Sequence, residues 1–375
     1  VQPGVTNLGI SQAVDAEGFY YAPDPSSQIA CSIGGNVAEN AGGVHCLKYG
    51  LTTNNLLGLE MVLLSGEVIR LGGKHLDSGG YDLMGLLTGS EGLLGVITEI
   101  TVRILKKPET ARALLIGFPS SEAAGACVGQ VIGSGIIPGG MEMMDKAAIH
   151  ASEEFCHAGY PLEAEALLIV ELDGPGREVD HLIEKVGAIA EGCGSTSLRI
   201  SETEAERDAF WAGRKAAFPA IGRISPDYMC MDGTIPRNRL PEVLARMGEL
   251  SKKHGLAVAN VFHAGDGNLH PLILFDANAG ELETAEEFGA DILRLCVEVG
   301  GVLTGEHGIG VEKRDLMAEV FTEQDLAQQQ RIKCAFDPNG RLNPGKVFPV
   351  LHRCAELGQL VVHKGKIPFP EIPRF

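Results

Sequence analysis

The chain has 375 residues, enough for two domains, and its 45% hydrophobic content is ordinary for a globular protein. Acidic residues outnumber basic ones by 49 to 31, so the formal net charge of -18 argues against a nucleic-acid partner and against docking on an anionic membrane by charge. The nine cysteines include no C-x-x-C pair, which excludes the clustered spacings of an iron–sulfur site and favours a reduced, cytoplasmic protein.

The start of the chain predicts a missing piece. The sequence begins at Val1 without a signal peptide, and its first residues read like the interior of a domain. No apolar stretch reaches the length of a transmembrane helix. We therefore expect a fragment or one chain of a split protein.

Residues 1–106 are rich in glycine and in predicted strands. Two apolar runs meet at Ser65 and Gly66, which predicts a hairpin. The β-branched run 93–105 predicts a buried strand. Lysines and a proline at 106–108 predict a domain boundary.

Strands and helices alternate over residues 113–200. The pair Ser120–Ser121 is expected to cap a helix. The predicted strands cover 113–118, 166–172 and 196–200, and a further helix covers 177–191. Two β-α-β units in succession indicate a ferredoxin-like α+β layer. Longer helices are expected from residue 202 onward, the last near 323–336, followed by an irregular tail from Pro338.

The most informative motif is FHAGDGNLH at residues 262–270. An Asp-Gly pair between apolar runs is a strong hairpin signal. A two-residue turn at Asp266 and Gly267 would place His263 opposite His270, with Cβ atoms roughly 5 Å apart. Two imidazoles so placed can share a metal ion. The alternative is a hairpin with two incidental histidines, since the chain has eleven.

A second motif, GGVLTGEHGIG at residues 300–310, holds an acid and a histidine among glycines. Glu306 could complete a His-His-carboxylate set for a metal ion. His307 could act as a general base, because imidazole titrates near neutrality. The alternative is a glycine-rich loop with a solvated Glu-His pair.

Two further stretches are candidate binding sites. The glycine-rich stretch 32–43 suits a phosphate or a planar cofactor, but it lacks the G-x-G-x-x-G pattern of a nicotinamide site. Arg214 follows the only tryptophan by one helical turn and could bind a substrate carboxylate through two parallel hydrogen bonds. The alternative is an exposed arginine on an amphipathic helix.

Together and in this order, the motifs resemble the vanillyl-alcohol-oxidase type flavoproteins, in the branch of D-lactate, D-2-hydroxyglutarate and glycolate dehydrogenases. The glycolate-oxidising members are the most similar. The stretches that carry the resemblance span the chain: DPSSQIACSIGGNVAENAGG, GSEGLLGVITEITV, FWAGRKAAFPAIGRISPDY, NVFHAGDGNLHPLILF, GEHGIG, AFDPNGRLNPGK and the ending PFPEIPRF.

The resemblance implies an α+β fold with FAD as cofactor. It assigns residues 1–106 to the C-terminal part of an FAD-binding domain of this type. Residues 107–336 become a ferredoxin-like cap domain for substrate and metal, and 337–375 a tail that returns to the flavin domain. Family members begin with another half of the flavin domain, which carries the pyrophosphate loop. We therefore expect the isolated chain to hold FAD weakly.

The same resemblance assigns roles to individual residues. His263, His270 and Glu306 match the ligands of one divalent metal ion, zinc, manganese or iron. His307 matches the catalytic base, and Arg214 matches the arginine that binds the substrate carboxylate. The positions that match the flavin-binding residues are Pro23, Ser32, Gly34, Gly35, Asn36, Asn40, Gly43, Glu91, Gly92, Gly95, Ile97 and Asn343.

The implied reaction is the FAD-dependent oxidation of a small 2-hydroxy acid, glycolate or D-lactate, to its 2-keto acid. One cationic anchor followed by the apolar residues 229–231 predicts a monocarboxylate, because a second buried carboxylate would lack a partner. The implied partners are a second FAD-binding-type subunit and an iron–sulfur subunit, and any contact with the inner membrane is through them. The alternatives are a D-lactate or D-2-hydroxyglutarate dehydrogenase of the same branch, and a cofactor-free structural subunit.

Overall fold

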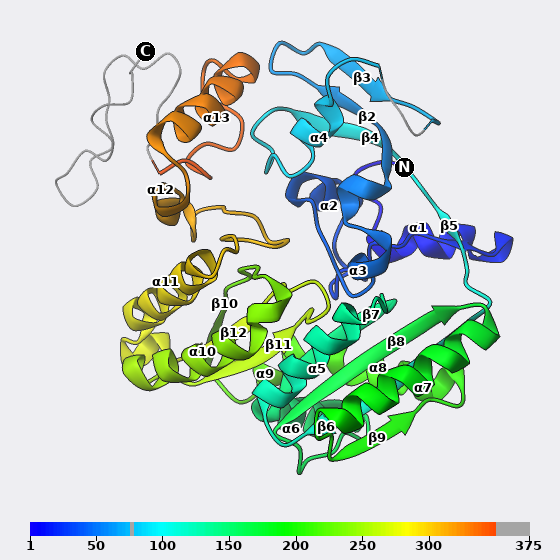
Figure 1. The fold of residues 1–375 in the computed structure, drawn as a ribbon. Helices are drawn as coiled ribbons and strands as arrows, with labels where there is room; N and C mark the ends of the chain where they lie inside the picture. Colours follow the sequence, from blue (N-terminus) through cyan, green and yellow to red (C-terminus); the bar gives the residue numbers. More distant parts are fainter. Residues whose placement is uncertain (76–78, 350–375) are drawn as a thin grey trace. The chain divides into compact units, whose positions relative to one another are not determined.

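The computed structural model describes residues 1–75 and 79–349 (Figure 1). Its contacts divide the chain into two compact units. The first unit comprises Val1–Gly42, Gly50–Lys106 and the chain from Glu306 onward, and the second comprises Gly43–Tyr49 and Lys107–Gly305. Both units mix helices with antiparallel strands, so the predicted α+β class is confirmed.

The contact-defined units differ in part from the expected domains. A break after residue 106 coincides with the expected boundary, but the second unit ends at Gly305, whereas 336 was expected. The segment Gly43–Tyr49 also belongs to the second unit. Lys48 links this segment to the second unit through an ion pair, in which its ammonium lies 2.6 Å from the Asp173 carboxylate. The part of the expected tail beyond residue 349 lies outside the described residues.

The second unit is built on a sheet of seven strands, all within the described part of the chain. The strands are β6 (Thr110–Phe118), β7 (Gly140–Asp145), β8 (Ala166–Gly174), β9 (Ser197–Ile200), β10 (Asp227–Cys230), β11 (Val258–Phe262) and β12 (Pro271–Phe275). Their order is β10-β12-β11-β7-β8-β6-β9, and every pairing is antiparallel. The β7-β8-β6-β9 part has the ferredoxin-like order, and β11, β12 and β10 extend it.

Helices cover this sheet. They are α3 (Cys46–Tyr49), α5 (Ser121–Gly133), α6 (Lys146–Cys156), α7 (Gly176–Gly192), α8 (Glu204–Lys215), α9 (Ala217–Ile221), α10 (Leu240–His254) and α11 (Leu282–Glu298). Helices α5 and α7 contact each other and both β6 and β8, so they share one face. Ser120 caps α5 as predicted, since its hydroxyl accepts from the Ala123 amide at 3.1 Å. In the described residues no helix is both long and apolar enough to cross a bilayer.

The first unit contains two small sheets. One has the order β3-β2-β4, formed by β2 (Leu56–Val62), β3 (Val68–Gly72) and β4 (Val96–Val102), and the other pairs β1 (Phe19–Tyr20) with β5 (Leu105–Lys106). Its helices are α1 (Asn7–Val14), α2 (Ile33–Glu39), α4 (Leu83–Leu87), α12 (Met317–Val320) and α13 (Glu323–Phe336). The predicted hairpin is confirmed: β2 pairs antiparallel with β3, and Gly66 adopts a left-handed φ of +85° in the turn.

One expected strand differs from the structure. The run 93–105 is not one buried strand: β4 begins at Val96, which is 56% exposed, and within β4 only Ile100 is fully buried. β4 is partly exposed because it lies at an edge of its sheet and one of its faces points away from the core.

Candidate metal and substrate site

The turn between β11 and β12 is longer than predicted. The His263 amide donates to the Asn268 carbonyl at 3.0 Å, and the Gly267 amide donates to the His263 carbonyl at 3.1 Å. Four residues, 264–267, therefore separate the last paired residues. The prediction that His263 lies opposite His270 across a two-residue turn is wrong.

The longer turn has a physical cause. Gly267 adopts a φ of +83° and lies so close to the Ile235 carbonyl that a Cβ would be 2.2 Å from that oxygen. The Asp266 carboxylate accepts from the Asn268 amide at 3.0 Å and closes the loop. Packing against a distant segment, together with this local hydrogen bond, selects the turn.

The register change leaves the two histidines on one face. Val261 now pairs with His270, as its amide donates to the His270 carbonyl at 3.4 Å, so the pairing is shifted by two residues. Strand side chains alternate between faces, and an even shift preserves the face. The rings of His263 and His270 have centroids 4.9 Å apart and are nearly perpendicular, at 86°.

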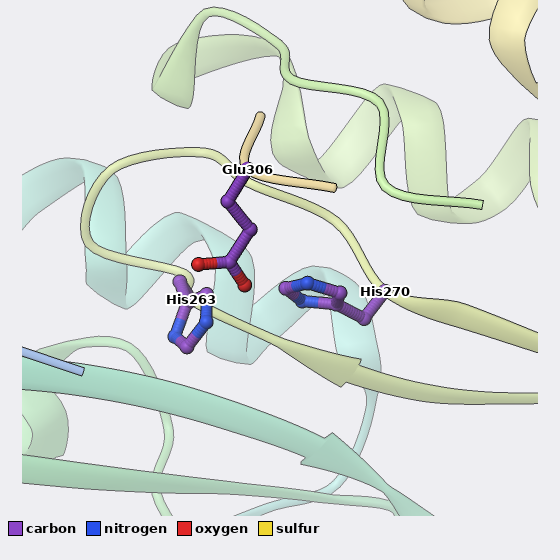
Figure 2. A group of neighbouring side chains, drawn as sticks. All are labelled: His263, His270 and Glu306. Atoms are coloured by element: carbon purple, nitrogen blue, oxygen red, sulfur yellow. The ribbon is translucent and has the colours of Figure 1, made fainter. Parts of the chain in front are cut away.

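Figure 2 shows His263, His270 and Glu306 as neighbouring side chains. One ligand atom from each lies within 4.8 Å of the others. Both histidines are buried, with exposures of 4% and 2%. Glu306 directly follows Gly305, the last residue of the second unit.

Asp232 fixes the backbone just before Glu306. Its carboxylate accepts from the Thr304 hydroxyl at 3.1 Å and from the Gly305 amide at 3.0 Å. Asp232 is itself fully buried. Asp232 therefore fixes the position of the backbone next to Glu306, a role that its sequence motif did not predict.

The donor set suits a divalent ion. Ligand atoms bound to one zinc ion at about 2.1 Å are separated by roughly 3 to 4 Å, and these three donors lie within 4.8 Å of one another. Two imidazoles and one carboxylate leave coordination positions open for a substrate. These three residues were expected to converge, and the structure brings them together.

Glu142, on β7, contacts the first of these histidines. Its Oε1 lies 2.7 Å from Nδ1 of His263, and its side chain is buried, with 1% exposure. A carboxylate at Nδ1 accepts the N–H there and leaves Nε2 as the metal-binding nitrogen. No motif in the sequence pointed to Glu142; the signal that could have found it is an acid inside the apolar strand Gly140–Asp145.

Arg214 lies in the last turn of α8, and its side chain is buried. Its Nε and Nη2 lie 2.8 and 2.7 Å from Oε2 of Glu142. Its Nη1 is buried and has no hydrogen-bond partner among the described residues. A buried, unpaired N–H is costly, which favours a ligand acceptor at that position. The alternative of a solvated surface arginine is wrong.

His307 differs in exposure from the metal-site histidines. Its side chain is 42% exposed, and its Nε2 lies 3.9 Å from the Glu306 carboxylate. Beyond it, the Glu91 carboxylate accepts from the Ile309 and Gly310 amides at 2.6 and 2.8 Å. Glu91, expected near the flavin, therefore orders the loop that carries His307.

A second carboxyl group lies against the same loop. Burial, and next the charge of Glu91, raise the pKa of Glu39 to about 7, although Lys313 opposes the shift. Gly308 has a φ of +80°, a conformation that favours glycine, and a Cβ there would lie 2.2 Å from the Glu39 carboxylate. Glu39 was not predicted from the sequence, where its only signal is its position between the expected flavin-binding residues Asn36 and Asn40.

Several predicted flavin positions cluster around α2. Ser32 caps this helix by accepting from the Gly35 amide at 3.2 Å. Asn36 is buried, and its side-chain oxygen accepts from Asn7 at 2.9 Å. Asn40 ends the helix with a left-handed φ of 53°. Backbone amides and glycines at a helix start are well suited to a phosphate or flavin edge.

The remaining flavin positions are spread over other segments of the chain. Asn343, with a φ of 40°, donates to the Glu91 carbonyl at 2.5 Å, so these two predicted residues are in contact. The Pro23 carbonyl accepts from Asn7 at 2.9 Å. Gly34 lies close to Pro3, and Gly95 lies close to Met61. Gly92 has a φ of +70°, and Ile97 is half-buried on β4. Gly43 begins the segment that is grouped with the second unit.

Comparisons with known proteins identify the family. A model described as "FAD linked oxidases, C-terminal domain" matches residues 107–347, and one described as "FAD binding domain" matches residues 1–72. The glycolate oxidase subunit GlcD of Escherichia coli (strain K12) is 61% identical over 376 residues, covering 100% of this chain and 75% of that protein. The D-lactate dehydrogenase of Archaeoglobus fulgidus is 35% identical over 350 residues, covering 92% of this chain and 75% of that protein.

Solved structures agree on the fold. p-Cresol methylhydroxylase with substrate bound matches with a TM-score of 0.75 at 17% identity, covering 92% of this chain and 75% of that one. An alkyldihydroxyacetonephosphate synthase matches with a TM-score of 0.67 at 19% identity, covering 92% of this chain and 63% of that one. At these identities the likeness concerns the fold alone. The two family models and the identity to GlcD show that the chain belongs to the FAD-linked oxidases and is an FAD-linked oxidoreductase.

Proposed function

We propose that this chain oxidises a small 2-hydroxy acid, with glycolate as the principal substrate, to the 2-keto acid, glyoxylate. The observation that carries the proposal is the convergence of His263, His270 and Glu306, whose ligand atoms lie within 4.8 Å of one another. The 61% identity to a glycolate oxidase subunit supports the choice of substrate. The three residues would hold one divalent ion, of zinc, manganese or iron.

The chain's own residues orient the substrate and move a proton. When bound, a divalent ion supplies positive charge that acidifies an alcohol, and FAD accepts a hydride. Arg214 donates from Nη1 to the substrate carboxylate and fixes its direction. His307 takes the hydroxyl proton as general base. Ser32, Asn36, Asn40 and the glycines around α2 bind the flavin.

Partner proteins complete the proposed reaction. The E. coli relative is named as a subunit of glycolate oxidase, which supports a multi-subunit enzyme. The chain has no C-x-x-C spacing for an iron–sulfur cluster, so electrons from reduced FAD need another carrier. We assign this task to a second FAD-binding-type subunit and an iron–sulfur subunit. The chain would work in the cytoplasm and meet the inner membrane through these partners.

D-Lactate is the second candidate substrate. Two relatives named D-lactate dehydrogenase are 35% and 33% identical over more than nine-tenths of this chain. Asp227 and Asp232 flank the apolar residues 229–231, and both form hydrogen bonds within the chain. Asp227 accepts from the Ala277 amide at 3.0 Å, and Asp232 accepts from the Thr304 hydroxyl. Comparing kcat/KM for glycolate, D-lactate and D-2-hydroxyglutarate separates the candidates.

The test is flavin reduction by substrate without oxygen, in full-length protein loaded with FAD. Glycolate is expected to bleach the visible flavin absorbance, and elemental analysis is expected to find one divalent ion per chain. His263→Ala should lose the metal and lower kcat/KM at least about 100-fold while the chain stays folded. Retained flavin that none of the three acids reduces would exclude the proposed reaction.

A further inference from the structure

Glu142 is shared between the proposed metal site and the proposed substrate arginine. Its Oε1 lies 2.7 Å from Nδ1 of His263, whereas its Oε2 lies 2.8 and 2.7 Å from Nε and Nη2 of Arg214. All three side chains are at least 95% buried. One buried carboxylate therefore contacts residues 72 and 121 positions away in the sequence.

This arrangement needs a carboxylate. Both neighbours are donors, so the bridging side chain must accept at both of its atoms. A glutamine of the same shape has one acceptor and one donor, and its NH2 would face either the guanidinium or the imidazole N–H. Glutamine must therefore break one of the two contacts in either orientation.

The contacts also fix direction on both sides. On His263, acceptance at Nδ1 selects the tautomer whose Nε2 binds a metal. On Arg214, two held nitrogens lock the guanidinium plane, so the direction of the unpaired Nη1 is set. The strand β7 supplies the rigid base, because the exposed fraction of Glu142 and its neighbours Met141 and Met143 is 1% or less.

We propose that Glu142 is a positioning residue that joins metal binding to substrate binding. It orients His263 toward the metal and Arg214 toward the substrate carboxylate, so a change at Glu142 disturbs both at once. The inference rests on the proposed function, because it assumes a metal at His263 and a carboxylate at Arg214.

Metal affinity is the first measurement. Zn²⁺ is titrated into the purified, metal-stripped chain against a chromophoric chelator, for the wild type and for Glu142→Gln. The variant is expected to bind about 10- to 100-fold more weakly, the usual effect of removing a carboxylate behind a ligating histidine. Glu142→Asp keeps the charge beside Arg214 and thus the fold, but it is too short for both partners, so it should bind about tenfold more weakly.

Glu171 offers a matched control. It is a buried glutamate on the next strand, β8, and it too bridges a histidine and a second donor: its oxygens lie 3.0 Å from His45 and 2.6 Å from the Trp211 indole nitrogen. Glu171→Gln should lower the melting temperature without changing the zinc affinity by more than about twofold. Equal losses of affinity in both variants would show a general loss of packing and would overturn the inference.

Steady-state kinetics at saturating metal give the second measurement, in full-length enzyme loaded with FAD. Glu142→Gln should raise the KM for glycolate more than it lowers kcat, since Arg214 loses its orientation. Wild-type zinc affinity in both Glu142 variants would overturn the inference and leave the metal proposal intact. A wild-type chain that binds no zinc or manganese would instead remove the proposed metal site itself.

Discussion

The side chains at the loop of residues 306–310 show how surroundings set chemistry at the scale of one residue. Glu39 and Glu91 are both carboxylic acids near this loop, yet they differ. Glu91 accepts two backbone N–H groups, whereas the Oε2 of Glu39 has no hydrogen-bond partner among the described residues. Partial burial favours the neutral form of a carboxyl group, and so does the negative charge of Glu91, which is the direction of the Glu39 pKa shift.

This difference predicts a pH-dependent stability. The pKa of Glu39 is raised from 4.5 to about 7 on folding, so the folded chain binds the proton more tightly. Its unfavourable contribution therefore appears as the pH rises from about 4.5 to about 7 and persists above. Glu39→Gln should be more stable than the wild type near pH 8 by about 1 kcal/mol, after allowance for partial exposure, and similar near pH 5.

The measurement is urea unfolding of both proteins across this pH range. Glu17→Gln, at an exposed glutamate in the same unit, is the control for the loss of one carboxylate. A Glu39→Gln difference that is constant with pH would refute the assignment.

At the scale of elements, the hairpin of β11 and β12 decides where the metal ligands lie. Its strands follow from alternating apolar residues, but its turn is set by the approach of Gly267 to the Ile235 carbonyl. A Cβ at Gly267 would be 2.2 Å from that oxygen, closer than any real contact. The turn therefore depends on a residue outside the hairpin.

Gly267→Ala is expected to destabilise the chain and to weaken metal binding. The alanine must adopt a φ of +83° and also push against a backbone carbonyl, so the loss should be about 2 kcal/mol or more. Gly280→Ala is a matched control, because Gly280 has the same φ of +83° with no atom within 4 Å of the added Cβ. That variant should lose only about 1 kcal/mol and keep its zinc affinity. Equal losses in unfolding measurements on the two variants would rule out the close approach as the cause.

At the scale of the molecule, the proposed metal should contribute to stability. A ligand that binds only the folded chain raises the unfolding free energy by about 2.7 kcal/mol at 100 times its Kd. Zinc should therefore raise the melting temperature of the stripped chain in calorimetry, and EDTA should reverse the shift. His270→Ala should abolish it, whereas His181→Ala, at an exposed histidine on α7, should retain it. A full shift in His270→Ala would place the stabilising ion elsewhere.

The sequence by itself determined the local features. Strand β8, the hairpin at Gly66 and the cap at Ser120 follow from runs of apolar residues, turn residues and capping residues a few positions apart. The prediction that His263 and His270 share one face is correct although the predicted register was wrong. Side chains alternate along a strand, so a register shift of two residues leaves them on the same face.

Only the tertiary structure decided the register, the burial and the partners. Turn length at residues 264–267 depends on Ile235, and the burial of Arg214 depends on Glu142, which is 72 positions away. The amphipathic pattern of helix α8 is compatible with either an exposed or a buried Arg214, so the periodicity does not decide between the two placements. A lone acid in an apolar strand signals that a partner must exist, because an unpaired buried charge is too costly, but it does not say which residue that is. The partner of a buried acid is set when strands from distant parts of the chain pack together, and the spacing of residues in the sequence does not predict it.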